Sequence, residues 1–554
     1  MLGCGEGADS MPDDEDTAVE ASALGACATQ LAISSVTASG AEAGNPASQA
    51  IDGDLTTRWS NFGVGSTLTA DLGATKSVCS VGVAWYKGTL RASSYTVSVS
   101  TTGSTFTTVF SGQSSGTSNA LEVVSFAATA ARYVRITVNG NTESDWASIT
   151  ELAVTGSGGF VHPGVLVSKA QLDLIKAKVN ANVEPWKTIY AQMAASKYGK
   201  LTYTPTPFVT VVRGASGTPM PGCTEEVDDG HAAIAHAIMY NVTGNTAHAD
   251  KTIQILNAWS YTLVSHTGEN APLQVAWAAE NFTRAAEIIR YTSTRWAAAD
   301  VTKFKTMLNT AFLPLIKNGW PWSNGNWDLA MIDAMMGIGV FNDDQATFDK
   351  GVDLFKKRVP AYIYLTSDGE FPVRPTGTSQ YATDAAVLAL WYWPSTTVGG
   401  VTKPKYPLVN GVSQETCRDF NHVSLGITSM ADAAETAWIQ GLDLYSYSNF
   451  ETRISKAIEF HSTYLNGATI PTWLCGGEAV YRGSGTSPSV GFFSKTPYSL
   501  SLNYTVAYNH YANRLAMSLP QTSLAISTIN SNGSYYRNKV GQTAVWENLT
   551  NREK

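Results

Sequence analysis

Residues 324–341, with the sequence NGNWDLAMIDAMMGIGVF, place a short polar group directly before a long apolar run. Residues 417–445 repeat this arrangement, because CRDFNH precedes VSLGITSMADAAETAWIQGLDLY. Apolar residues that recur every three to four positions over such lengths predict helices that are buried on most sides. We therefore expect two inner helices of a helical domain, each beginning with polar side chains.

The polar groups at these two helix starts supply a carboxamide from Asn326, a guanidinium from Arg418 and an imidazole from His422. Arg418 and His422 are four residues apart, so both can face one side of a helix or of its entry turn. Together the three groups suit chemistry on a carboxylated sugar. The alternative is structural: Asn326 caps its helix, and Arg418 forms a local ion pair with Asp419.

The rest of residues 160–554 continues the helical pattern. Ser168 is expected to cap a helix, and further amphipathic runs follow between short turns, among them DDGHAAIAHAIMYNVTG, LQVAWAAENFTRAAEIIRYT and SLNYTVAYNHYANRLAMSL. Paired helices without intervening strands predict an all-α domain, an α/α toroid or solenoid rather than a β/α barrel. Its cleft is expected at the ends of the inner helices, where loops such as residues 368–384 gather.

Residues 28–156 have a different pattern. Short alternating strands such as STLTADLG, SYTVSVS and RYVRITVNG lie between Gly, Ser and Asn residues, which predicts a β-sandwich. The sequence TGSGG at 155–159 reads as a linker to the helical domain. Residues 1–27 are acidic and contain Gly and Ser, so we expect a disordered tether.

Length and charge restrict the classes of protein. A chain of 554 residues is too long for one ordinary core, so a multidomain protein is expected. The net charge of −8 argues against a nucleic-acid partner, and an acidic polymer would need a local basic groove. No run of about 20 apolar residues is present to span a membrane. We expect a secreted, cell-surface or periplasmic bacterial protein that is a monomer.

The six cysteines include no CxxC pair, so a zinc ribbon or a thioredoxin-like site is not indicated. Two pairs are disulfide candidates that the sequence does not prove: Cys27 with Cys79, and Cys417 with Cys475. The start, MLGC, looks like the remnant of a bacterial lipoprotein cleavage site, with Cys4 as the lipid-bearing residue. The alternative is a chance cysteine.

Several stretches of the sandwich segment are recognisable: PASQAIDGDLTTRWS at 46–60, DLG at 71–73, ARYVRI at 131–136 and ITELAV at 149–154. They closely resemble the discoidin or coagulation-factor C family, which includes the family 32 carbohydrate-binding modules. The resemblance covers the whole segment and implies a glycan-binding domain.

The discoidin resemblance also implies a structural calcium ion near the first loop. The ligands would be the carbonyl of Gln49, the carboxylates of Asp52 and Asp54, Thr57, and Glu151. Hard oxygen ligands of this kind suit Ca²⁺, and the alternative is a turn stabilised by Asx hydrogen bonds. Trp59 is expected in the core, and the candidate glycan contacts are Trp85, Tyr86, Arg91 and Trp146.

The helical segment carries a second resemblance. Its matching stretches are NAWS at 257–260, residues 323–341, ETCRDFNHVSLGI at 415–427, QGLDLY at 440–445, PTWLCGG at 471–477 and AYNHYANRLAMSLP at 507–520. The combination resembles the alginate-lyase superfamily of α/α-toroid polysaccharide lyases. It implies cleavage of a uronic-acid polymer by β-elimination, which leaves a 4,5-unsaturated uronate end. Alginate or polymannuronate is the favoured substrate and glucuronan the alternative.

Such a lyase has three tasks: to neutralise the sugar carboxylate, to take the C5 proton and to protonate the leaving oxygen. In the resemblance, Asn326 matches the neutralising Asn, and Arg418 matches the Arg that precedes the catalytic residue. We expect His422 as base or carboxylate partner and Tyr508 as acid. The assignment of the base stays open, since Trp327 replaces a His of several relatives and Ser424-Leu425 replaces their Tyr.

Other residues are expected around the cleft. Tyr511, Tyr481 and Tyr381 are alternative acids, and Tyr508 could instead be core. The predicted substrate contacts are Trp327, Arg374, Trp473, His231, Tyr481, His510 and Tyr511. Either tryptophan could instead pack beneath the cleft, and His510 could be structural. His236 is interpreted as a core residue, since its spacing of five from His231 does not suit a metal pair on a helix.

Two other functions remain as alternatives. A glycoside hydrolase on a similar toroid would need two carboxylates in the cleft, which could come from Asp328, Asp333, Glu370, Glu415 and Asp419. A surface adhesin would use the sandwich to bind glycans and the toroid only as a support. Neither a GxGxxG motif nor a P-loop is present, so no cofactor is expected for catalysis.

Overall fold

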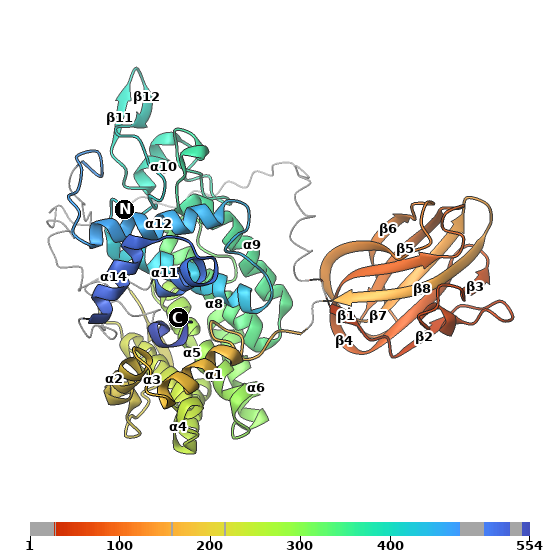
Figure 1. Ribbon diagram of the computed structural model, residues 1–554, viewed down its shortest axis with the longest axis horizontal. Coiled ribbons are helices and arrows are strands. Elements are labelled where there is room, and N and C mark those ends of the chain that lie inside the picture. Colours follow the sequence, from red (N-terminus) through yellow and green to blue (C-terminus); the bar gives the residue numbers. More distant parts are fainter. Residues whose placement is uncertain are drawn as a thin grey trace. The chain divides into compact units, whose positions relative to one another are not determined.

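A computed structural model of the chain describes residues 27, 29–156, 159–214, 218–476, 504–531 and 546–553. The chain divides into two compact units, Met1–Gly159 and Phe160–Lys554, and Figure 1 shows that the first is made of strands and the second mainly of helices. Each unit has its own hydrophobic core.

The first unit is a β-sandwich, as predicted. All of its strand pairs are antiparallel, in the order β1-β8-β4-β7-β5-β6, with β2 paired to β4 and β3 paired to β8. The strands are β1 (Thr29–Leu31), β2 (Ser35–Ala38), β3 (Trp59–Phe62), β4 (Ser66–Trp85), β5 (Ser93–Ser100), β6 (Thr107–Gln113), β7 (Glu122–Asn141) and β8 (Trp146–Gly156).

The two longest strands hold the sandwich together. The first part of β4 pairs with β2 and the second part with β8, while β7 follows it along both parts with a break in register between Asp71 and Lys76. Thr155 and Gly156 still belong to β8 and pair with β1 and β4. The predicted linker therefore begins inside a strand.

The core of the sandwich corrects one predicted contact. Trp59 is fully buried, as predicted, and its indole Nε1 donates to the carbonyl of Gly40 at 2.9 Å. Trp85 was predicted to face a glycan, but it is only 1% exposed and packs on Tyr95 with ring centroids 4.9 Å apart. Since residues alternate between the two faces of a strand, Trp85 points into the core while its neighbour Tyr86 points out.

The second unit is largely helical and consistent with an α/α toroid. Its longer helices are α1 (Lys169–Asn180), α2 (Trp186–Ala195), α3 (Cys223–Thr243), α4 (Thr246–Thr262), α5 (Ala271–Thr292), α6 (Ala298–Met307), α8 (Gly325–Asn342), α9 (Gln345–Tyr362), α11 (Phe420–Ile439), α12 (Phe450–Leu465) and α14 (Pro520–Ser531). The shorter ones are α7 (Leu313–Ile316), α10 (Asp384–Leu390), α13 (Thr505–Tyr508) and α15 (Glu547–Thr550). The predicted Ser168 cap is present, because its hydroxyl accepts from the amide of Gln171.

Several details differ from the predicted pattern. The first predicted helix is divided into α1 and α2 at Asn182, which has a φ of 57°. The domain also contains strands, since β9 (Thr210–Val212) pairs with β10 (Ser265–Thr267), and β11 (Ser395–Val398) with β12 (Val401–Pro404). These strands are only three or four residues long, too short for the alternation of apolar residues to mark them.

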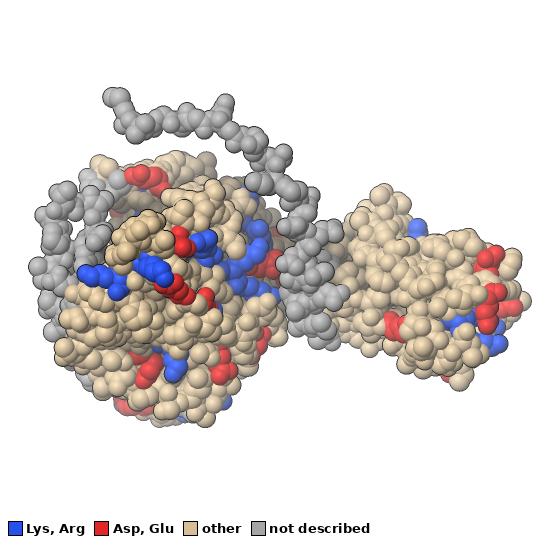
Figure 2. Space-filling view, turned by 90° about the horizontal axis from the view of Figure 1, so that it is seen from above, with Lys and Arg blue, Asp and Glu red and all other residues tan. Residues whose placement is uncertain are grey.

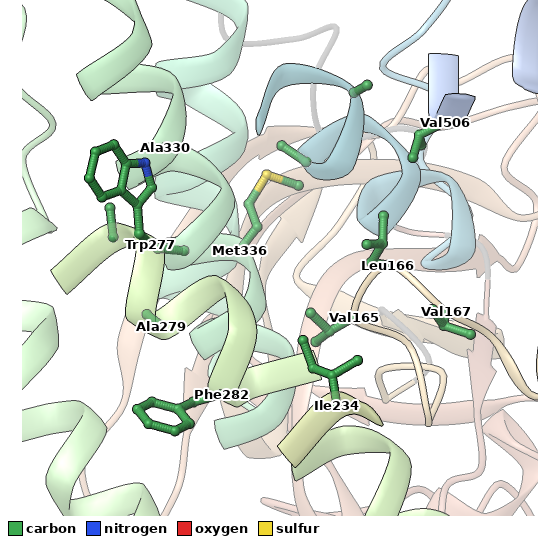
Figure 3. Packing of buried hydrophobic residues seen from close by; sticks show 14 of the residues in the cluster. Val165, Leu166, Val167, Ile234, Trp277, Ala279, Phe282, Ala330, Met336 and Val506 are labelled. Atoms are coloured by element: carbon green, nitrogen blue, oxygen red, sulfur yellow. The ribbon is translucent and has the colours of Figure 1, made fainter. Parts of the chain in front are cut away.

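The helices α3, α5, α8 and α11 lie side by side and run in the same direction. Gly230 of α3 faces Asn281 of α5, and further along, Thr283 of α5 faces Gly337 of α8. A Cβ at Gly337 would lie 2.7 Å from the Thr283 hydroxyl, so glycine permits the close approach. Figure 3 shows side chains of α5 and α8 within one cluster, among them Phe282 and Met336.

A buried ionic group lies in the middle of these helices. Arg284 of α5 donates to Asp333 of α8 at 2.9 Å, to Asp432 of α11 at 2.8 Å and to Glu547 of α15 at 3.2 Å. All four side chains are at most 3% exposed. We call Arg284, Asp333, Asp432 and Glu547 the buried cluster; it fixes the inner helices to one another.

Two predicted disulfides are present, Cys27–Cys79 in the sandwich and Cys417–Cys475 in the helical unit. The surface seen in Figure 2 is mainly uncharged, and its positive and negative side chains are interspersed. Among the described residues, none of the helices is both long and apolar enough to span a membrane. Cys4, the predicted lipid-bearing residue, lies outside the described residues.

Candidate active site

Asn326 lies in the first turn of α8 and is 2% exposed. It is not the N-cap, because Asn324 occupies that position. Its side-chain Nδ2 donates to Glu415 Oε1 at 2.7 Å, and its backbone N–H donates to Glu415 Oε2 at 3.2 Å. Since a carboxylate only accepts hydrogen bonds, Glu415 sets the orientation of the amide. The amide oxygen Oδ1 is buried without a partner.

Glu415 also binds Arg418, so a single carboxylate joins the two residues that the sequence singled out. Arg418 Nη1 donates to Glu415 Oε1 at 2.7 Å, and the Tyr362 hydroxyl donates to Oε2 at 3.0 Å. Burial disfavours the charge of Arg418, but the nearby Glu415 outweighs it and raises the pKa of the guanidinium. Arg418 therefore pairs with Glu415 and not with Asp419, the partner expected in the structural alternative.

Asp419 instead pairs with His422. It is the N-cap of α11 and accepts from the backbone N–H of His422 at 2.8 Å, while its Oδ2 lies 2.6 Å from His422 Nδ1. Burial opposes ionisation of Asp419, yet the hydrogen bonds from His422 lower its pKa. A carboxylate at Nδ1 keeps the proton there. In the neutral imidazole, Nε2 is then the atom that can accept a proton.

We call Asn326, Glu415, Arg418, Asp419 and His422 the end cluster. Arg418 and His422 are partly accessible, with 19% of the Arg418 side chain and 24% of the His422 side chain exposed. The cluster lies at the N-terminal ends of α8 and α11, and the parallel helices α3 and α5 begin at the same end. Helix N-termini carry a partial positive charge, so this end of the domain favours an anionic ligand.

Tyr392 is a further residue of this region that the sequence pattern did not reveal. Its ring lies 5.9 Å from Arg418 Cζ, and its hydroxyl donates to Asn324 Oδ1 at 3.2 Å. Its φ of 53° is unusual for a residue with a side chain and costs about 1 kcal/mol or more, a strain found mainly at functional sites. Burial raises the pKa of its phenol, which stays protonated at neutral pH.

Three predicted substrate contacts are core residues instead. His231 is 2% exposed and meets Tyr198 edge to face, with centroids 5.4 Å apart. His510 is fully buried and stacks on Tyr445 at 3.8 Å, and burial lowers its pKa to about 4. Tyr511 is also fully buried and donates to the carbonyl of Tyr445. The rings that cover them, Tyr198 and Tyr445, come from other segments of the chain, so local periodicity does not predict this burial.

His236 is a core residue, as predicted. Its side chain is fully buried, with a relative exposure of 0%. Its Nδ1 lies 2.8 Å from His248 Nδ1, and burial lowers the pKa of His236 to about 3.

The predicted acid, Tyr508, does not join the end cluster. It ends α13 and lines a cavity of about 120 Å³ with Asn509, Asn513 and residues of α14. That cavity contains no residue of the end cluster. Among the alternatives, Tyr381 is partly buried and its hydroxyl donates to the carbonyl of Trp322. Tyr481 lies outside the described residues.

The other predicted contacts lie at the margins of the site. Trp327 follows Asn326 and is partly buried against the main core. Trp473 is partly buried in a smaller cluster that includes the Cys417–Cys475 disulfide. Arg374 is exposed and paired with Asp384. The structure therefore brings Asn326, Arg418 and His422 together and leaves these three residues as peripheral.

The sandwich has its own basic surface. Arg58 Cζ lies 4.1 Å from the centroid of the Tyr86 ring, with Lys87 Nζ and Arg91 Cζ each at 5.6 Å. Tyr86 and Lys87 line a cleft of about 360 Å³. Trp146 is outside this cleft and packs edge to face on Phe62, with centroids 5.2 Å apart. An aromatic ring among three cations suits an acidic sugar.

The predicted calcium ligands gather at one loop of the sandwich. Thr57 Oγ1 lies 2.8 Å from Asp52 Oδ2, 3.0 Å from the Asp54 carbonyl and 3.4 Å from the Gln49 carbonyl. Glu151 Oε2 accepts from the amide of Gly53, and burial with the charge of Asp52 raises the pKa of Glu151.

This oxygen-rich arrangement fits a hard cation. Within the described ranges, no three side chains of His, Cys, Asp or Glu are grouped for a metal, so the set depends on backbone carbonyls.

Each carboxylate proposed for a hydrolase is already paired with another side chain. Asp328 binds Arg358 at 2.7 Å, Asp333 belongs to the buried cluster, and Glu370 faces Lys403 on the surface. Glu415 and Asp419 orient the other members of the end cluster. A glycosidase needs one carboxylic acid with a raised pKa at the cleft, whereas the pKa of Asp419 is lowered. The Asp419–His422 pair instead presents an imidazole of the kind that can act as a general base.

Comparison with known families agrees with both domains. Residues 34–152 match the family model described as F5/8 type C domain, and residues 223–373 match the one described as Alginate lyase. The second match includes Asn326 but ends before Arg418. No curated protein matches the chain.

Solved structures similar to the chain include "CBM32 of AlyQ in complex with 4,5-unsaturated mannuronic acid", with 48% identity and a TM-score of 0.23 over 23% of this chain and 98% of that one. A second is "Truncated AlyQ with CBM32 and alginate lyase domains", with 44% identity and a TM-score of 0.23. That match covers 26% of this chain and 38% of the other. A third is the family 32 CBM from C. perfringens NanJ in complex with galactose, at 26% identity and a TM-score of 0.20, over 22% of this chain and 92% of that chain.

Proposed function

Because the chain joins a domain of the F5/8 type C family to a domain of the alginate lyase family, we propose that it cleaves a uronic-acid polymer by β-elimination. Polymannuronate, as found in alginate, is the favoured substrate, and glucuronan is the alternative. The single observation that supports this proposal is the end cluster. One buried carboxylate, Glu415, holds Asn326 and Arg418 together beside the Asp419–His422 pair.

The first task falls to Arg418 and Asn326. The guanidinium and the second N–H of the Asn326 amide donate to the C6 carboxylate of the sugar and neutralise its charge. The C5 proton then becomes more acidic, because the negative charge that develops on the carboxylate is stabilised by donors that are already oriented. The N-terminal ends of the inner helices add to this effect.

The proton steps fall to His422 and Tyr392. His422 Nε2 takes the C5 proton, the electron pair forms the C4–C5 double bond, and the C4–O4 bond breaks. The leaving O4 takes a proton from the phenol of Tyr392. We assign this acid to Tyr392 rather than to Tyr508, because Tyr392 adjoins Arg418 whereas Tyr508 lines a separate cavity.

An absorbance assay tests the proposed reaction. The full chain is incubated with polymannuronate, polyguluronate and glucuronan, and the ultraviolet absorbance of the new conjugated double bond is followed. A lyase produces this absorbance, whereas a hydrolase or an adhesin does not. Absence of the signal with all three polymers would contradict the proposed function.

Two matched variants test the acid. Tyr392→Phe removes only a hydroxyl and is expected to lower kcat by about 10²-fold or more, the usual contribution of a general acid. Tyr508→Phe is expected to retain activity close to that of the wild type. The opposite result would return the role to Tyr508.

The sandwich is proposed to hold the enzyme on its acidic substrate through Tyr86, Arg58, Lys87 and Arg91. We also propose that calcium binds at the loop formed by Gln49, Asp52, Asp54 and Thr57, next to Glu151, with backbone carbonyls among its ligands, and stabilises the sandwich. At a calcium concentration 100 times the Kd, the expected gain is about 2.7 kcal/mol. Thermal unfolding with calcium and with a chelator measures it, and identical melting of the sandwich would refute the site. These roles suit a secreted or cell-surface enzyme.

A further inference from the structure

Arg213 differs from most of the other described arginines of the helical domain in its partners. Eight of those arginines each have a carboxylate oxygen within 4.0 Å. Arg213 is half-buried, and its hydrogen-bond partners among the described residues are neutral: Gln274 Oε1 at 3.0 Å and Cys223 Sγ at 3.5 Å. Burial lowers the pKa of Arg213, because it removes water from the charged guanidinium. An anionic ligand that paired with this guanidinium would stabilise its charge.

The guanidinium is held in a fixed orientation. Its Cζ lies 4.4 Å from the centroid of the Trp277 ring, and Trp277 is only 4% exposed. Both described hydrogen bonds use Nη1. The edge formed by Nε and Nη2 therefore makes no side-chain hydrogen bond to a residue that the structure describes. That edge is the one with which arginine binds a carboxylate through two parallel hydrogen bonds.

Gln274 fixes the other side of this arrangement. Its Oε1 accepts from Arg213 and from Cys223 Sγ, and its Nε2 donates to the Cys223 carbonyl and to Glu226 Oε2. With all of these contacts made, Gln274 is fully buried and cannot rotate freely. The fork of Arg213 is therefore already in place before a ligand binds, which lowers the entropic cost of binding.

Arg213 lies at the same end of the domain as the end cluster. Trp277 and Gln274 are in the first two turns of α5, Cys223 begins α3, and Asn326 is in the first turn of α8. Arg213 contacts the start of α5, and Asn326 lies at the start of α8. The two helices are parallel neighbours, and the axes of packed helices are about 8–10 Å apart. Figure 3 shows Trp277 of α5 in the same cluster as Ala330 of α8, one turn after Asn326.

We propose that Arg213, supported by Trp277, binds the carboxylate of a sugar unit next to the one that reacts. This inference rests on the proposed function. Arg213 would make the enzyme prefer polymers in which acidic sugar units follow one another. The reacting carboxylate is met by Arg418, whose charge is largely balanced by Glu415. The additional positive charge that an acidic polymer requires is then supplied by Arg213.

Kinetics of Arg213→Gln and Arg213→Lys in the full chain, on polymannuronate, test the proposal. Arg213→Gln is expected to raise KM about tenfold or more with kcat changed less than about threefold, because a distant carboxylate is bound equally in ground and transition states. Arg213→Lys keeps the charge without the fork, so an intermediate KM is expected. The ratio of the KM values of Arg213→Gln and wild type should shrink at high salt.

Arg295→Gln is the matched control, since Arg295 is an exposed arginine paired with Asp250. It should leave KM unchanged, and thermal melting should show that all variants are folded. A KM of Arg213→Gln equal to that of the wild type, in an active enzyme, would overturn the proposal and leave the proposed function intact. A fall in kcat alone would also overturn it, because Arg213 would then act on the reacting unit.

Failure of the proposed function gives a different result, which is the absence of unsaturated product from the wild type. Calorimetric titration with a mannuronate oligosaccharide then decides the role of Arg213. The wild type is expected to show two binding events, one in each domain, and Arg213→Gln only the event of the sandwich. Two unchanged events, or a single event that Arg213→Gln leaves unaltered, would overturn the proposal.

Discussion

The end cluster and the buried cluster are built from similar side chains on the same two helices. Asn326 and Asp333 are seven residues apart on α8, which is about 10 Å along a helix, and α11 contributes His422 to one cluster and Asp432 to the other. Both clusters combine an arginine with carboxylates. They differ in access, because Arg418 and His422 are partly exposed whereas the buried cluster is at most 3% exposed.

This difference separates chemistry from structure. In the end cluster each carboxylate orients a group that keeps an atom for a ligand, such as the second N–H of the Asn326 amide or Nε2 of His422. In the buried cluster three carboxylates converge on Arg284, and burial raises the pKa of Asp333 to about 6. The position of a polar group along the helix, more than its type, decides whether it can act on a substrate.

The largest effect is expected from Arg284→Met. The variant leaves three buried carboxylates without their cation, and breaking such a group typically lowers the free energy of unfolding by about 3–5 kcal/mol. Urea unfolding followed by helical circular dichroism measures this loss. Arg295→Met, at an exposed ion pair with Asp250, should leave stability close to that of the wild type. Equal effects of the two variants would show that the buried cluster does not support the fold.

Asn326→Ala is expected to act on catalysis. It removes a donor whose contribution is greatest in the transition state, so kcat should fall by about 10²–10³-fold while KM changes little. The initial rate of formation of the unsaturated product measures it. Asn342→Ala, at the other end of α8, is the matched control and should retain full activity. If both variants were fully active, the end cluster would not be the catalytic site.

Glu415→Gln is expected to have a smaller effect on the same step. The neutral amide weakens the hydrogen bonds from Asn326 and Arg418, each worth about 1.5–3 kcal/mol to a charged acceptor. We expect kcat to fall about tenfold with the pH of maximal activity unchanged, because Glu415 orients the donors and transfers no proton. A shift of the pH profile in this variant would instead indicate a direct role in proton transfer.

The smallest effects are expected in the pH dependence of stability, where the two clusters should have opposite signs. The pKa of Asp419 is lowered, so its contribution is present above about pH 4 and is lost as the pH falls below that value. The pKa of Asp333 is raised to about 6, so stability falls as pH rises from about 4 to 6.

Unfolding free energies at about pH 3, 5 and 7 measure these slopes. Asp419→Asn should remove the decrease in unfolding free energy below about pH 4. Asp333→Asn should remove the decrease between about pH 4 and 6. Each slope is at most about 1.4 kcal/mol per pH unit. Slopes of the same sign in both variants would contradict the difference in environment between the two clusters.

The sequence by itself determined the local structure and the division of the chain. Alternating residues identified the strands of the sandwich, and helical periodicity identified α3, α5, α8 and α11, because both patterns depend on neighbouring residues only. The polar starts of α8 and α11 also pointed to Asn326, Arg418 and His422. Resemblance to two families supplied the reaction class, which periodicity alone does not contain.

The tertiary structure decided which of these groups meet. The partner of Asn326 is Glu415, 89 residues further along the chain, and no local pattern indicates a contact between segments so far apart. Tyr392 lies beside Arg418 although it follows a short helix, whereas Tyr508 lines a separate cavity and His510 and Tyr511 are fully buried. In a helix that is apolar on all sides, the periodicity cannot tell which face is innermost, because packing between distant segments sets that direction.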